Sequence, residues 1–298
     1  MVNSFEDVIN GAKKMGKKRV AIAWAADDVI LESVKAADEA GLADCVLIGI
    51  KDQILKSAEA ANYNVKDENI VEAKTEREAG ILAVELINAG KADMPMKGMM
   101  QTSDFLRPIL NKETGLRDRN DLSQIGVYEK PQGGLLFMTD CAMTIAPDLQ
   151  GKITILENAV AVVRKLGIDC PKVALLSFLE QVNLSSEASR DAAIISKMAD
   201  RGQIKNCIVD GPLALDNAIV PYAAEHKGIK SPVAGAADII VVPNIDVGNA
   251  LSKSFSFVAG LKFGAVVAGA KVPVIMSRRA DSIESKLQSL ALCRYLMN

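Results

Sequence analysis

Short apolar runs alternate with segments of helical periodicity along most of the chain, and this alternation restricts the possible folds most. The run "VAIAWA" precedes residues 27–40, whose apolar positions recur at helical spacing up to Gly41, and the run "CVLIGI" follows. This is the order of a β-α-β unit. Because the same order continues towards the C-terminus, we expect an α/β fold with parallel sheets in a doubly wound architecture.

The second half of the chain repeats the pattern and suggests a domain boundary. Its apolar and periodic segments predict strands at 135–139, 172–178, 206–209, 238–243 and 272–276, and helices at 151–167, 186–201 and 249–262. The Pro- and Gly-rich stretch "EKPQGG" interrupts the pattern at 129–134. We therefore expect two α/β domains, 1–134 and 135–281, with a cleft between them. Whether the C-terminal helix, 282–298, returns to pack on the first domain is left open.

Charge and composition exclude several classes of protein. The 35 Lys and Arg nearly balance the 37 Asp and Glu, which argues against bulk electrostatic binding to nucleic acid or to an anionic membrane. No apolar run reaches the roughly 20 residues of a membrane helix. The N-terminal residues are typical of an amphipathic helix and a basic turn rather than a signal peptide, so we expect a cytoplasmic protein.

Metal and disulfide frameworks are also unexpected. The five cysteines are scattered without any CxxC spacing, and His226 is the single histidine. We therefore expect no metal site and no disulfide framework.

Two adjacent arginines near the C-terminus are the first candidate site. Arg278 and Arg279 follow the apolar run "VPVIM" directly, so they lie at the carboxyl end of a predicted strand, where open α/β sheets bind ligands. The helix predicted from Ile283 adds backbone N–H groups that favour an anion. Asp281 and Glu284 fit a capping box, with Asp281 as the N-cap. Because adjacent side chains of an extended stretch point to opposite sides, we expect one arginine to bind the anion and the other to face solvent or steady the turn.

A second candidate lies in "VVPNIDVGNALSKSF", residues 241–255. A strand ends there at Pro243, and "DVGN" is interpreted as a turn before a helix that starts near Asn249. Gly248 would let a ligand approach the backbone, and Lys253 lies about one helical turn further on. The chain contains neither GxxxxGK[ST] nor GxGxxG, so phosphate-loop and dinucleotide fingerprints are absent.

Two further motifs carry polar residues at the ends of apolar segments. In "KGMMQTSDFLRP", 97–108, Thr102 or Ser103 is expected to cap a short helix that contains Arg107. In "TDCAMTIAPD", 139–148, Asp140 ends a strand and is either catalytic or the cap of a turn. GxSxG is absent, and Cys141 is expected to be a buried thiol. The lack of a convincing nucleophile favours direct attack of one substrate on another.

Several of these segments, taken together, resemble the phosphate acetyl/butyryltransferases. The matching segments follow the family's order and are "KGMMQTSDFLRP", "TDCAMTIAPD", "DGPLALDNAI", "SPVAGAADIIVVPNIDVGNALSK" and "SRRADS". The resemblance implies a two-domain fold shared with isocitrate and isopropylmalate dehydrogenases, and an active site in the interdomain cleft. The implied reaction is butanoyl-CoA + phosphate ⇌ butanoyl phosphate + CoA. CoA would be a substrate, no cofactor would stay bound, and the protein would form a homodimer or a larger assembly.

The resemblance also implies roles for individual residues. Arg279 and Arg107 match family arginines that contact the phosphoryl group, and Ser282 and Glu284 match further positions. Ser285 stands where the acetyltransferases have an Asp proposed as the base for the CoA thiol, so the base would be Glu284 or Asp281, or be dispensable. The remaining expected substrate-binding residues are Ser282, Ser277, Thr102, Asp246, Gly248, Asn249 and Lys253.

Three other functions stay open at this point. One is a phosphate acetyltransferase, although the compact length and the "RADS" segment resemble the butyryl members more, with a preference for C3–C5 acyl groups. Another is a metal- and NAD(P)-dependent decarboxylating dehydrogenase of the same fold, which needs several converging aspartates. The third is a non-catalytic module that binds CoA or an acyl phosphate in the cleft.

Overall fold

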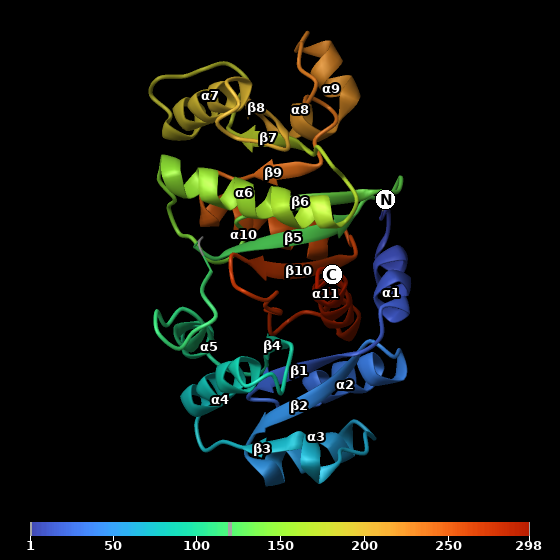
Figure 1. Ribbon diagram of the computed structural model, residues 1–298. Coiled ribbons are helices and arrows are strands. Elements are labelled where there is room, and N and C mark those ends of the chain that lie inside the picture. The colour runs from blue at the N-terminus through green and yellow to red at the C-terminus, as the bar shows by residue number, and fades with distance from the viewer. Residues whose placement is uncertain (1, 119–120, 298) are drawn as a thin grey trace. The chain divides into compact units, whose positions relative to one another are not determined.

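The computed structural model describes residues 2–118 and 121–297, which form two compact α/β units. We call them the terminal unit, Phe5–Asn120 with Phe263–Asn298, and the central unit, Met1–Ser4 with Asp121–Lys262. Strands and helices alternate in both (Figure 1), so the α/β class expected from the sequence is confirmed.

The division between the units differs from the expected one. The expected boundary at residue 134 lies inside the central unit, between two strands of its sheet. The chain re-enters the terminal unit at Phe263 rather than at 282, so the terminal unit is built from two separate segments. The loop at 130–134 is a tight turn in which Gly133 and Gly134 have positive φ, so its Pro and Gly residues mark a hairpin and not a linker.

The terminal unit is organised around a parallel sheet. Its strands, in the spatial order β3-β2-β1-β4, are β3 (Ile70–Glu72), β2 (Ala43–Gly49), β1 (Lys18–Ala23) and β4 (Met94–Lys97). The apolar residues of β1 and β4 are fully buried, as expected for parallel strands that are covered on both faces.

Helices of the terminal unit begin where the sequence provides caps. They are α1 (Phe5–Lys14), α2 (Asp28–Glu39), α3 (Lys51–Ala60), α4 (Glu76–Asn88), α5 (Thr102–Ile109) and α11 (Ile283–Tyr295), with a 3-10 turn at Asp67–Asn69. The unit also contains β10 (Phe263–Ala268). The Asp27 carboxylate accepts from the Ile30 N–H and caps α2, and the Thr75 hydroxyl accepts from the Glu78 N–H and caps α4.

The C-terminal helix is an integral part of the terminal unit. α11 packs against α1, α2 and β10. The Arg294 guanidinium donates to the carbonyls of Met15 and Gly16, at 2.5 and 2.6 Å. Leu290 to Arg294 are all buried, which places this helix in the core of the unit.

The central unit contains a mixed sheet with the strand order β5-β6-β9-β7-β8. The strands are β5 (Ser123–Glu129), β6 (Leu135–Thr139), β7 (Lys172–Leu176), β8 (Ile208–Leu213) and β9 (Ile239–Val241). β5 and β6 are antiparallel, because the tight turn joins them directly, and the other pairs are parallel. The helices are α6 (Leu149–Lys165), α7 (Glu187–Asp200), α8 (Leu215–Ile219), α9 (Pro221–His226) and α10 (Ile245–Lys253), followed by a π-helical turn at Ser254–Val258.

Two predicted elements differ in the structure. α10 begins at Ile245, with Asn244 as its N-cap, so Gly248 and Asn249 lie inside the helix rather than in a turn before it. The Asn244 side chain accepts from the Val247 N–H at 3.1 Å. This cap starts the helix before Gly248, whereas Gly248 was expected in the loop. The segment 272–276 forms isolated β-bridges instead of a regular strand.

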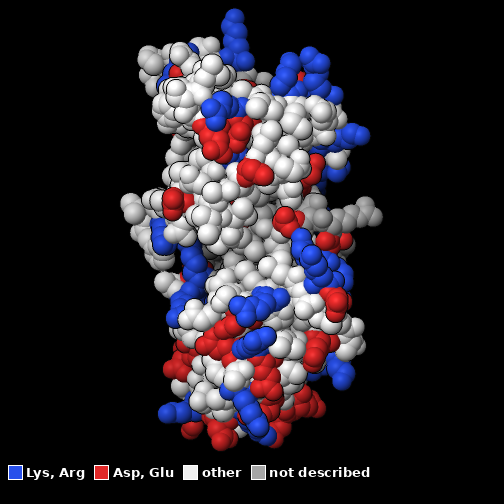
Figure 2. Space-filling view, turned by 90° about the vertical axis from the view of Figure 1, so that its left-hand side faces the viewer, with Lys and Arg blue, Asp and Glu red and all other residues white. Residues whose placement is uncertain are grey.

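The charges on the surface are mixed in sign. On the face shown in Figure 2, Lys and Arg side chains alternate with Asp and Glu side chains over the terminal unit, in keeping with the balanced formal charge. No helix in the described part of the chain combines the length and apolarity needed to cross a membrane.

Candidate active site

The carboxyl edge of the terminal sheet brings several of the sequence motifs together. Residues 272–276 run beside β4, where Met96 and Ile275 form a parallel bridge. The Lys97 N–H donates to the Ile275 carbonyl at 2.9 Å. Because these segments and β1 run in the same direction, the residues that follow each of them meet at one edge of the sheet.

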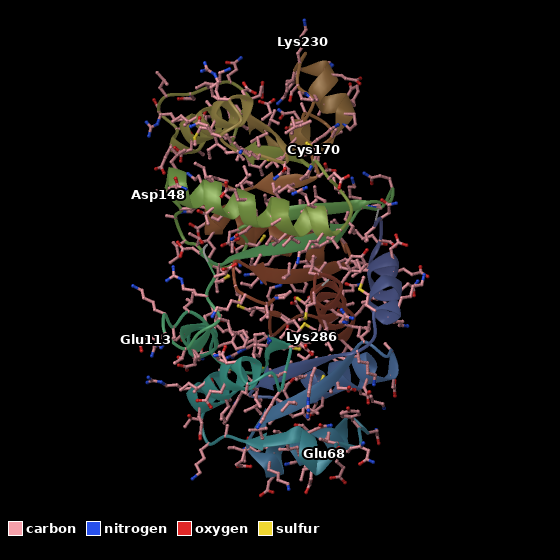
Figure 3. All side chains as sticks on the ribbon, in the orientation of Figure 1. Glu68, Glu113, Asp148, Cys170, Lys230 and Lys286 are labelled. Atoms are coloured by element: carbon pink, nitrogen blue, oxygen red, sulfur yellow. The ribbon has the colours of Figure 1, made fainter. Side chains whose placement is uncertain are left out.

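A small pocket lies at this edge, and several of its lining residues are basic. Its cavity volume is only about 10 Å³, and it is lined by Asp27, Ile30, Lys97, Gly98, Met99, Ser277, Arg278, Arg279 and Lys286. Four of these side chains are basic and one is acidic, so the pocket favours an anion. Lys286, at the start of α11, is labelled in Figure 3.

Arg278 stabilises the turn that leads into α11. Its backbone N–H and its Nε donate to the two oxygens of the Asp281 carboxylate, at 2.7 and 2.9 Å. Its guanidinium carbon lies 4.2 Å from the centre of the Phe263 ring, a cation–π distance. The stabilising role is one of the two alternatives expected for Arg278.

Arg279 has different surroundings from Arg278. Its side chain is exposed, and no described residue forms a hydrogen bond or an ion pair with its guanidinium. The two neighbouring arginines therefore differ in availability, since one is held by a carboxylate and the other is open to a ligand. That Arg279 binds phosphate stays a prediction.

The two carboxylates expected as bases are both engaged. Asp281 is only 6 % exposed and binds Arg278, while Glu284 accepts from the Gln288 amide at 3.0 Å. The predicted capping box is wrong, because Ser282 is the N-cap of α11 and its hydroxyl accepts from the Ser285 N–H at 3.1 Å. Asp281 instead binds the backbone of the preceding turn.

Lys97 is a pocket residue that the sequence reasoning missed. It is 5 % exposed, and its Nζ donates to the carbonyls of Gly98 and Met100, at 3.3 and 3.1 Å. Burial lowers the pKa of Lys97, and the Arg279 guanidinium lowers it further. Its position directly after the buried run "MPM" is a sequence signal, because a lysine that ends a buried strand lies at the ligand-binding edge.

Lys286 was missed in the same way. It is 3 % exposed, and its Nζ donates to the carbonyls of Asp281 and Arg278, at 2.6 and 3.3 Å. Burial lowers the pKa of Lys286, against the opposing effect of nearby Asp281 and Asp27. In sequence it lies three residues after Ile283, on the face of the helix that carries the apolar residues, which could have identified it.

The other site residues expected in the terminal unit have different positions. Ser277 is buried and lines the pocket. Arg107 is exposed on α5 and is not among the residues that line the pocket. Thr102 is the first residue of α5 and does not cap it, since the N-cap is Gln101 without a side-chain bond. The roles of Arg107 and Thr102 stay predictions.

In the central unit, the two remaining motifs lie side by side. The Ile245 N–H donates to the Ile145 carbonyl at 3.0 Å, and the Asn249 amide lies 3.5 Å from the Cys141 carbonyl oxygen. A Cβ at Gly248 would collide with the Asp140 carbonyl, so glycine permits this close packing. Asp246 and Lys253 are exposed on α10, and their roles stay predictions.

Asp140 organises the loop that follows β6. Its buried carboxylate accepts from the backbone N–H groups of Ala142, Met143 and Thr144, at 3.0 to 3.1 Å. Burial raises the pKa of Asp140, while these hydrogen bonds oppose the rise. Of the two alternatives for Asp140, the structure thus shows the cap. The loop lines an apolar pocket of about 450 Å³ and leaves Ile145 73 % exposed.

The contact at Gly248 gives a stability prediction. Gly248→Ala is expected to lower the free energy of unfolding by about 1–3 kcal/mol, because the added methyl overlaps the Asp140 carbonyl and the Val242 side chain. Urea unfolding followed by circular dichroism measures it. Ala250→Gly, at an exposed position of the same helix, is the control and should lose only about 1 kcal/mol from helix propensity. Unchanged stability of Gly248→Ala would contradict the packing described here.

A pocket with several basic side chains at the carboxyl edge of an α/β sheet is typical of proteins that bind small anionic molecules such as phosphates. The chain belongs to the phosphate acetyl/butaryl transferase family, whose model matches residues 69–293. This confirms the resemblance noted in the sequence.

Individual relatives agree with this assignment. The chain is 44 % identical to a phosphate butyryltransferase of Clostridium acetobutylicum, with 98 % of this chain and 97 % of that protein covered. It is 40 % identical to a phosphate acetyltransferase of Thermotoga maritima, with 96 % and 97 % covered. Among solved structures, a branched-chain phosphotransacylase from Enterococcus faecalis V583 superposes with a TM-score of 0.82 at 36 % identity, covering 94 % of this chain and 99 % of that one.

Proposed function

We propose that the protein transfers an acyl group reversibly between CoA and inorganic phosphate, butanoyl-CoA + phosphate ⇌ butanoyl phosphate + CoA. Family membership supports the reaction type. The observation that supports placing the reaction in this pocket is the exposed Arg279 guanidinium, which lines it together with the buried Lys97 and Lys286. The Arg279 guanidinium and the N–H groups of the two lysines suit the phosphate that is the nucleophile in one direction and the leaving group in the other.

The reaction needs no covalent intermediate on the protein. The CoA thiolate attacks the carbonyl carbon of the acyl phosphate, and phosphate leaves. The planar guanidinium of Arg279 can bind two phosphate oxygens at once, which neutralises and orients the leaving group. Holding both substrates in this way supplies much of the rate acceleration.

Thiol release tests the function directly. Butanoyl-CoA is incubated with and without phosphate, and free CoA is detected with a thiol reagent. We expect release only when phosphate is present. Binding of CoA without release would favour the non-catalytic module, and reduction of NAD(P)⁺ with a hydroxy acid substrate would favour the dehydrogenase.

The acyl group gives a second prediction. The chain is expected to prefer C3–C5 acyl-CoA, with a higher kcat/KM for butanoyl-CoA than for acetyl-CoA. Because one methylene changes binding by only about 1–3 kcal/mol, neighbouring chain lengths should react as well. Specificity constants measured across the acyl series decide it, and a higher value for acetyl-CoA would identify a phosphate acetyltransferase instead.

We further propose a cytoplasmic homodimer or a larger assembly of dimers. The family resemblance supports the assembly, and the balanced charge and the absence of a spanning helix among the described residues are compatible with the location. Light scattering of the purified protein measures the mass of the assembly, and a monomer at micromolar concentration would contradict it.

A further inference from the structure

Lys97 is a buried amine whose hydrogen bonds suit the uncharged form. Its Nζ donates to two carbonyls, those of Gly98 and Met100, and within the described ranges no carboxylate lies at ion-pair distance. A neutral amine has two N–H groups, which these carbonyls occupy, and one lone pair, which is left over. Since Lys97 lines the pocket, that lone pair is available to a substrate.

Another buried lysine shows the arrangement that holds an ammonium. Lys152 is also 5 % exposed, but its Nζ lies 2.5 Å from the Asp191 carboxylate and 3.7 Å from that of Glu187. A buried ammonium needs such partners, because isolated charge is costly away from water. The absence of a comparable partner at Lys97 distinguishes the two sites.

The two cations near Lys97 add to the effect of burial on its pKa. Burial lowers its pKa most, and Arg279 and Lys286 lower it further, while Glu76 opposes them. Arg278 and Asp27 also line the pocket. Burial lowers the pKa of Lys286 as well, although Asp281 and Asp27 oppose this effect.

We propose that Lys97 is the general base that removes the proton from the CoA thiol. This inference rests on the proposed acyl transfer. It answers the question raised by Ser285, because the nearby carboxylates of Asp281 and Glu284 are bound to Arg278 and Gln288. Arg279, next to the base, holds the phosphate that leaves.

The proton and electron pairs balance over one turnover. The Lys97 lone pair takes the thiol proton, and the thiolate forms a C–S bond to the acyl carbon. The C–O bond to phosphate breaks, and its electron pair leaves with the phosphate oxygen. The Lys97 ammonium returns the proton to this oxygen, so the products are acyl-CoA and hydrogen phosphate, and the amine is restored. The reverse reaction follows the same steps backwards.

Chemical rescue tests the proposal in the direction from butanoyl phosphate and CoA. Lys97→Ala and Lys97→Arg are expected to lose about 10²- to 10⁴-fold in rate, the usual contribution of a general base. Arginine keeps the charge but does not deprotonate. Methylamine added to Lys97→Ala should restore part of the rate in proportion to its free-base concentration as pH is varied. Rescue that follows the methylammonium concentration instead would show that Lys97 supplies only charge and would overturn the proposal.

Two controls separate this inference from folding and from the proposed function. Unfolding midpoints of the variants verify that they fold, and near-wild-type activity of Lys97→Arg would also overturn the base. Lys286→Met is expected to raise KM for butanoyl phosphate without any rescue by the free base of methylamine. If wild-type protein releases no thiol from butanoyl-CoA with phosphate, the acyl transfer itself is wrong, whatever the variants do.

Discussion

Arg279→Ala is expected to slow phosphate-dependent acyl transfer about ten- to several-hundred-fold, because it removes charge-assisted hydrogen bonds worth roughly 1.5–3 kcal/mol or more. The loss should appear in the kinetics with phosphate and butanoyl phosphate varied, and CoA binding should change less. Arg279→Lys should recover only part of the rate, since an ammonium cannot bind two phosphate oxygens in the plane of a guanidinium.

The outcome at the neighbouring arginine decides whether the assignment is correct. Arg278 is bound to Asp281 and Phe263, so Arg278→Ala should mainly reduce stability and leave the phosphate dependence of the remaining activity closer to wild type. If Arg278→Ala shows the larger defect in phosphate kinetics, or if neither variant does, Arg279 is not the phosphate ligand.

Asp281→Ala is expected to lower the free energy of unfolding by about 1.5–3 kcal/mol. It removes hydrogen bonds from a buried carboxylate to the backbone N–H and Nε of Arg278. Thermal or urea unfolding measures the change. Asp246→Ala, at an exposed position, is the matched control and should stay within about 0.5 kcal/mol of wild type.

The same variant separates two roles of Asp281. If Asp281 is only a structural residue, the activity of Asp281→Ala should fall in parallel with its folded population. Asp281→Asn should then keep part of the stability through its amide oxygen. A fully stable Asp281→Ala protein without activity would instead support the general base that we expected from the sequence.

The regular elements were predictable where periodicity and caps agree. The strand at 135–139 was predicted with its observed bounds, and the helix starting at Ile283 was found because its apolar residues recur every turn. β5 was missed, since "SQIGVYE" mixes polar and apolar residues although nearly all of them are buried. Its burial depends on what covers the sheet, which local sequence does not encode.

The candidate site was predictable only in part. Arg279 follows an apolar run, so its place at the carboxyl edge of the sheet could be inferred, although that run forms isolated β-bridges and not the regular strand that we expected. Lys97 ends an apolar run and Lys286 lies on the apolar face of a helix, but both signals were overlooked because a lysine is normally a surface residue. The tertiary structure shows both of them buried. The prediction that Asp281 caps α11 was wrong, because Ser282, the next residue, is the N-cap.

The discontinuity of the terminal unit has a consequence for how the molecule is made. Its first segment ends at Asn120, and its second begins at Phe263, after the whole central unit. During synthesis, β4 with Lys97 emerges long before the segment that carries Arg279 and Lys286. The bridge between Met96 and Ile275 must then close over the entire inserted unit, a slow, non-local step. An incomplete chain therefore holds Lys97 without its cationic neighbours, and the anion pocket comes into existence only when the last part of the chain has docked.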